Sequence, residues 1–127
     1  MIPAVRIAAA VLEACDVDTV TPYRPAQLAA SSAFVTPAET WKEIGEATFG
    51  HLEMGLDVFL VSALSDQEQA LDWLDVQSSI LLRLAPIDVD TDEVIATSVD
   101  APFVFSNIDG VQFLSCKVSY TRARFDR

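Results

Sequence analysis

The chain has 127 residues, a formal net charge of −11 and a sequence pI near 4.2. Its eight Lys and Arg residues are too few for the basic surface that binding to a nucleic-acid backbone requires. Apolar residues make up 51% of the sequence, so we expect some apolar faces to be buried against partners. An apolar-rich core in an ordinary monomer is the other interpretation of this composition.

Residues Pro3 to Cys15 predict the first helix. Proline is tolerated at a helix start because its missing N–H would have no partner there. At the helical period, one apolar face consists of Val5, Ala8, Ala9 and Leu12. Small alanines beside it allow another element to approach closely.

Three strands are predicted before the middle of the chain. A short strand begins within Asp16–Val20, and a second covers Ala33–Thr36 and stops at Pro37, because proline has no N–H for a strand ladder. Residues 38–50 predict a loop or a broken hairpin. Leu52–Ala63 is the clearest strand, since apolar side chains alternate along one of its faces.

The second half of the chain predicts one long helix and three strands. Ser65–Glu68 has the spacing of a capping box, and the helix that follows ends before Pro86. Its apolar stripe consists of Ala70, Leu71, Leu74, Ser78, Leu81 and Ala85. The strands are Glu93–Thr97, Pro102–Phe105 and Val111–Tyr120, the last two joined as a hairpin by the turn Asn107–Gly110.

This order of elements indicates an α+β fold. We expect a single domain over residues 1–127, with a largely antiparallel mixed sheet and two main helices packed on one face. Cys15 and Cys116 occupy apolar-patterned positions, and two cysteines do not make a disulfide framework, so both are expected to be buried free thiols. No segment is apolar and long enough to span a membrane, and we expect no membrane partner.

Few residues qualify for catalysis or ligand binding. There is no Gly-rich phosphate loop, and no Ser-His-Asp or Cys-His set has a recognisable spacing. The best candidates are His51, Asp57, Asp72 and Asp75. Asp88–Asp92 begins like a calcium loop, but the glycine and the bidentate glutamate of such a loop are missing. We therefore expect no enzyme, no catalytic residue, no cofactor and no metal ion.

The charge is unevenly distributed along the chain. From Lys117 onward there are four cationic residues and a single carboxylate, so an acidic body carries a basic tail at about residues 121–127. This asymmetry predicts head-to-tail contacts between copies, in which Arg122, Arg124 and Arg127 pair with Asp88, Asp90, Asp92 or Glu93. Trp41 and Phe49 are predicted to contact a partner or to fold back onto the core.

Several blocks occur in a familiar order. They are the Ala-rich helix Ala4–Ala14, the turn Tyr23–Pro25, the run Phe34–Pro37, the strand His51–Ala63, the acidic-capped helix Ser65–Asp75 and the closing strand Gln112–Arg122. In these blocks and their order, the chain resembles the tail terminator (minor tail, tail-completion) proteins of long-tailed bacteriophages. The tyrosine–proline turn is one residue tighter than in that family.

The resemblance implies a structural virion protein. Such a protein forms a ring, six-fold in the family, that caps the tail tube, stops its polymerisation and offers a surface for head-to-tail joining. The implied partners are other copies of the chain, the tube protein, the head-closure protein of the neck, and double-stranded DNA that passes through without specific binding. The implied location is the neck-proximal end of the virion tail, after assembly in the host cytoplasm.

The composition agrees with this function, because an acidic lumen does not hold phosphates and a rotation that closes makes a ring instead of a filament. Two alternatives remain open. One is a head-closure or other neck connector ring protein. The other is a small ligand-binding or enzymatic α+β domain.

Overall fold

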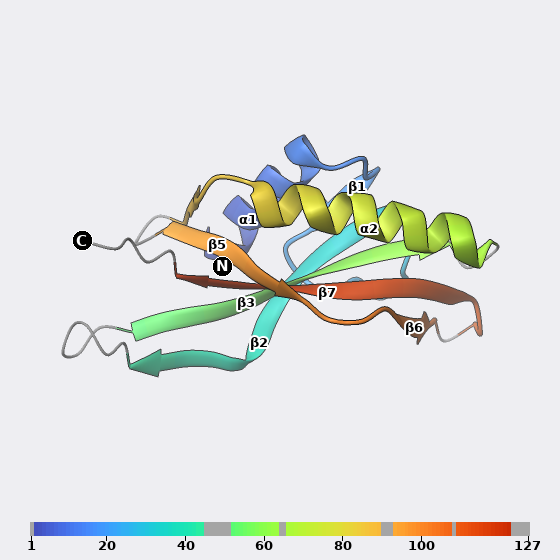
Figure 1. The fold of residues 1–127 in the computed structure, drawn as a ribbon. Helices are drawn as coiled ribbons and strands as arrows, with labels where there is room; N and C mark the ends of the chain where they lie inside the picture. Colours follow the sequence, from blue (N-terminus) through green and yellow to red (C-terminus); the bar gives the residue numbers. More distant parts are fainter. Residues whose placement is uncertain (1, 45–51, 64–65, 90–92, 108, 123–127) are drawn as a thin grey trace.

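Two helices lie on one face of a curled, seven-stranded sheet in the computed structural model (Figure 1). The structure describes residues 2–44, 52–63, 66–89, 93–107 and 109–122, with the backbone alone at 39–44 and 52–54. Within these ranges the elements are α1 (Ile2–Ala14), β1 (Thr19–Thr21), β2 (Ser32–Ile44), β3 (Leu52–Ala63), α2 (Gln67–Arg83), β4 (Ile87–Asp88), β5 (Glu93–Val99), β6 (Phe103–Ser106) and β7 (Gln112–Arg122). The predicted α+β class is confirmed.

The sheet is mixed and largely antiparallel, as predicted. Its order is β1-β2-β3-β7-β5-β4, and β6 pairs with the remaining part of β7. Among the described strands, β1 and β2 make the parallel pair, and the other pairs are antiparallel. The last strand in chain order, β7, therefore lies inside the sheet and contacts β3, β5 and β6.

The main core lies between the helices and the centre of the sheet. Facing pairs in β3 and β7 are Leu56 with Tyr120, Val58 with Val118, and Leu60 with Cys116. All six residues are at most 2% exposed. They pack with buried residues of α1 and α2 in one cluster, because strict alternation directs one side of each strand towards the helices.

Aromatic residues build a second, smaller core on the opposite face of the sheet. The rings of Phe34 and Phe59 stack with centroids 4.9 Å apart, and Phe103 meets Phe105 edge-on at 4.7 Å. The guanidinium of Arg24 lies 5.1 Å from the centre of the Phe105 ring. Such contacts add about 0.5–1.5 kcal/mol per aromatic pair beyond simple burial.

The segment before β2 closes this second core. The Asn107 side chain accepts a hydrogen bond from the Leu28 N–H at 2.9 Å and donates one to the Leu28 carbonyl at 3.1 Å. Leu28 itself is buried with Phe34 and Phe113. The predicted turn before β7 is also confirmed: the Asn107 carbonyl accepts a 2.9 Å bond from Gly110, which has a φ of 88°.

Strand β2 corrects the prediction of a strand that stops at Pro37. It runs on to Ile44, so residues 38–44 are strand and not loop. The reason is that β1 pairs with β2 only as far as Phe34, and the register with β3 shifts between Pro37 and Lys42. A proline is accommodated where one side of a strand has no neighbour, or at an irregularity.

Helix α2 begins one residue later than the predicted capping box. Asp66 is its N-cap and accepts bonds from the N–H groups of Glu68 and Gln69 at 3.1 and 3.2 Å. Its buried face includes Gln77, while Leu71 from the predicted stripe is 40% exposed. None of the helices in the described part of the chain is long and apolar enough to cross a membrane.

Candidate functional site

Helix α1 is apolar on two opposite faces. Its buried residues are Ala4, Ile7, Ala8 and Val11. The other face carries Ile2, Val5, Ala9 and Leu12, which we call the α1 stripe; its three large side chains are 55%, 51% and 49% exposed. The predicted apolar face joined Val5, Ala9 and Leu12 with Ala8, but in the structure Ala8 is buried and the other three are exposed. Ala4 and Ala8 allow close approach to the sheet, while Ile7 and Val11 fill the space beside them.

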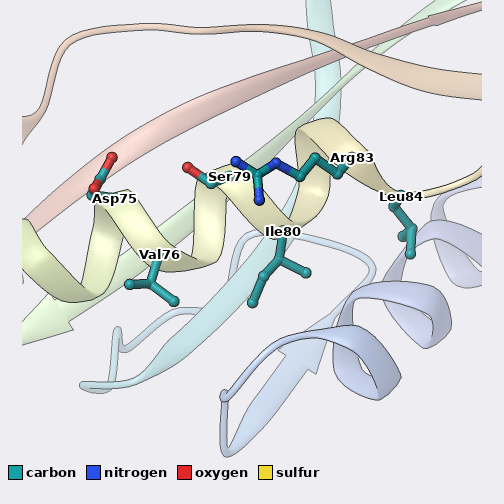
Figure 2. Close-up of a pocket in the computed structure, with 6 residues that line it drawn as sticks. All are labelled: Asp75, Val76, Ser79, Ile80, Arg83 and Leu84. Atoms are coloured by element: carbon teal, nitrogen blue, oxygen red, sulfur yellow. The ribbon is translucent and has the colours of Figure 1, made fainter.

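A first groove runs along α2. Its volume is about 460 Å³, and its lining residues are Asp75, Val76, Ser79, Ile80, Arg83 and Leu84 (Figure 2). Val76, Ile80 and Leu84 are four residues apart and form its apolar side, whereas Asp75, Ser79 and Arg83 form its polar side. Val76 is 53% exposed, so this groove adds apolar surface to the helical side of the molecule.

A second groove lies between α2 and the connection from β5 to β6. We call it the acidic groove; its volume is about 560 Å³, and the acidic residues Asp72, Asp75 and Asp100 are among those that line it. Its apolar lining comes from Leu71, Leu74, Leu82, Val99, Ala101 and Pro102, together with Cys116. The Asp100 carboxylate pairs with the Lys117 ammonium at 3.1 Å.

The acidic groove holds a thiol that is unsuited to nucleophilic chemistry. Cys116 is 2% exposed, and burial raises its pKa to about 11. A thiol with such a pKa is protonated at neutral pH, and the thiolate is the reactive form. Cys15 is also buried and free, with its pKa raised to about 11 by burial. The prediction of buried free thiols is confirmed.

The candidate residues for chemistry do not meet at one place. Asp57 pairs with Ser119 on the sheet face away from the helices and is 6% exposed. Burial raises the pKa of Asp57, while the Lys117 charge and a hydrogen bond with Ser119 lower it. Asp72 and Asp75 lie on α2, and His51 is outside the described residues. In the described ranges, no three His, Cys, Asp or Glu side chains form a group able to hold a metal ion.

The residues predicted to pair between copies lie together in one chain, as far as they are described. Asp88 pairs in register with Glu93, and the next residue of β5, Val94, pairs with Arg122. The rest of this set, Arg124, Arg127, Asp90 and Asp92, lies outside the described residues. Phe49 does too, and so does the side chain of Trp41, whose backbone belongs to β2. The intermolecular pairing stays a prediction.

Neither the α1 stripe nor the acidic groove was predicted from the sequence, and the reasons differ. The α1 stripe could have been found in the sequence, because a helix with two apolar faces has more apolar surface than one sheet covers. The acidic groove could not, because it brings α2 together with residues 99–102 and 116 across the fold. Comparison with known proteins adds no relative: no protein-family model matches the chain, and no curated protein matches it.

Proposed function

We propose that this chain is a structural virion protein that assembles into a ring, a tail terminator that caps the tail tube of a long-tailed bacteriophage. The observation that carries the proposal is the α1 stripe. Ile2, Val5 and Leu12 are each about half exposed on one helix face. Contiguous exposed apolar surface of this kind marks an interaction site.

The distribution of the apolar surface supports a ring of like copies. Exposed apolar side chains also occur on α2 at Leu71, Val76 and Leu82 and around the last hairpin at Val104 and Val111. Surfaces at different places on one molecule meet in heterologous contacts, and such contacts form a closed ring when the rotation closes. A ring that covers the end of the tube leaves no site for the next tube subunit.

The charge supports the passage of DNA through such a ring. The chain has a net charge of −11, so a ring of several copies repels a polyanion instead of binding it. A ligand-binding or enzymatic domain is supported less well, because Asp57 lies on the opposite face of the sheet from Asp72 and Asp75. The proposed partners are further copies, the tube protein and the head-closure protein.

The first test is native mass spectrometry over a concentration series, with negative-stain images of the largest species. We expect a closed ring with a hole that admits duplex DNA. The second test deletes the gene in a phage that encodes the chain. Tails of uncontrolled length are expected; tails of normal length with unjoined heads would instead identify a neck connector, and normal infectious particles would exclude both.

A further inference from the structure

The acidic groove has the chemistry of a docking site for a short cationic and apolar segment. Leu71 and Leu82 are 40% and 45% exposed at the groove, and an apolar side chain seated there removes their surface from water. Asp72 and Asp75 lie about one helical turn apart on α2 and present two carboxylates along the same edge. A matching ligand has an aromatic or aliphatic side chain flanked by cations.

The chain itself contains such a segment directly after β7. Residues 123–127 read Ala-Arg-Phe-Asp-Arg: Arg124 precedes Phe125, and Asp126 and Arg127 follow it, so the side chains carry one net positive charge. Arginine suits this partner, because its guanidinium pairs with carboxylates in a bidentate manner and its stem packs on apolar surface. The segment and the groove are therefore complementary in both charge and hydrophobicity.

This segment is too short to reach the whole groove of its own chain, although Val99, opposite Val118, is within its span. Cys116, which lines the groove, lies six residues before the end of β7 at Arg122, or about 20 Å away along the strand. Five residues beyond Arg122 span at most about 18 Å when fully extended, and they would first have to turn back. Pro102 lies at about the same level along β7 as Cys116, because the adjacent Phe103 pairs with Ser115 in an antiparallel register.

We propose that residues 123–127 of one copy dock in the acidic groove of a second copy. Phe125 contacts the apolar lining, and Arg124 and Arg127 pair with Asp72 and Asp75. This contact is heterologous, since a segment at one end of β7 meets a groove beside α2, and it repeats around a closed ring. The inference rests on the proposed function, to which it adds the surfaces that join neighbouring subunits.

The test uses a synthetic peptide of residues 121–127 and the full-length protein at a concentration where native mass spectrometry shows a monomer. Amide chemical shifts of the ¹⁵N-labelled protein are followed during titration. We expect saturable shifts at Leu71, Asp72, Ser78 and Val99. D72N/D75N should weaken binding about five-fold, the scale of two exposed ion pairs. D88N/E93Q loses the same charge and tests the competing pairing of the peptide's arginines with Asp88 and Glu93. It should bind like the wild type if the segment docks in the acidic groove.

Two outcomes would overturn the inference. One is the absence of saturable chemical-shift changes up to a peptide concentration of about 1 mM. The dissociation constant would then lie above about 1 mM, too weak for a specific contact. The other is equal binding by D72N/D75N and the wild type. A peptide with Phe125 replaced by Ala should bind more weakly than the parent peptide, and equal binding would remove the apolar part of the proposal.

The failure of this inference is distinguishable from failure of the proposed function. If rings form and the R124E/R127E variant assembles like the wild type, the ring protein stands and the docking mode is wrong. If the peptide binds the groove as expected but no ring forms at any concentration or on tail tubes, the docking mode stands and the terminator function is wrong.

Discussion

Helices α1 and α2 lie on the same face of the same sheet, but they use their apolar residues differently. α1 buries one apolar face and exposes a second one, the α1 stripe. α2 buries one face and directs mostly polar residues outwards, with Asp72 and Asp75 beside scattered apolar side chains. The comparison distinguishes residues needed for folding from residues that folding leaves exposed. Each helix needs one apolar face to pack on the sheet, so the second apolar face of α1 is available for contacts with other molecules.

The largest expected effect comes from the buried face of α1. Ile7 is 0% exposed, and I7A should lower the free energy of unfolding by about 3 kcal/mol, because it removes buried methyl groups and leaves a cavity. Urea denaturation of the monomer measures this. V5A on the opposite face is the matched control, and an equal loss in both variants would contradict the contrast between the two faces.

Replacing the α1 stripe should affect assembly and not folding. V5S/L12S should change monomer stability by about 0.5 kcal/mol or less, as exposed substitutions do. It should reduce ring formation at least about ten-fold, because burying two half-exposed side chains contributes roughly 1 kcal/mol each. Sedimentation velocity at several concentrations gives both the mass and the affinity. Assembly equal to the wild type would assign the stripe no part in the ring.

Substitution of the N-cap residue of α2 should have a smaller effect on the free energy of unfolding. D66A should lower the free energy of unfolding by about 1 kcal/mol, because two backbone N–H groups lose their acceptor. D66S keeps an oxygen at the cap and should recover most of this loss in thermal denaturation. Neither variant should change assembly, since Asp66 lies at the start of the helix and outside both grooves. If D66A reduced assembly as well as stability, this end of α2 would have to be part of the interface between copies.

The smallest effect is expected on the sheet face without helices. Burial raises the pKa of Asp57 above its ordinary value of 3.8, so the unfolded chain ionises first as pH rises. The contribution of this group to stability is therefore present below pH 3.8 and is lost as pH rises through the folded-state pKa. Relative to D57N, the wild type should lose stability over that range in urea titrations. An opposite slope would mean that Lys117 and Ser119 outweigh burial.

The elements predicted well are those in which local pattern and tertiary environment agree. The alternation in Leu52–Ala63 predicted β3 to the residue, because both its faces are set by the period of the strand. Strand β2 was cut short at Pro37, since the sequence does not reveal that a neighbour is missing there. The predicted apolar face of α1 combined the buried Ala8 with residues of the exposed stripe, because both faces are apolar and only packing against the sheet distinguishes them.

The α1 stripe and the acidic groove also differ in how far local sequence pattern predicts them. The excess of apolar residues predicted that some face would remain uncovered, and the α1 stripe is such a face. The acidic groove depends on the register of β6 with β7, which places Phe103 opposite Ser115 and carries Pro102 towards α2. Pairing between distant strands follows from the complete sheet, and no local pattern in the sequence contains it.

The position of β7 has a consequence for synthesis of the protein. Residues 112–122 are translated after every other described element, but the strand that they form lies between β3 and β5. Before this strand leaves the ribosome, β3 and β5 each lack the strand that lies between them, and α2 lacks part of the sheet on which it packs. The nascent chain therefore exposes unpaired strand edges until late in translation, the period in which chaperone binding protects a chain from aggregation.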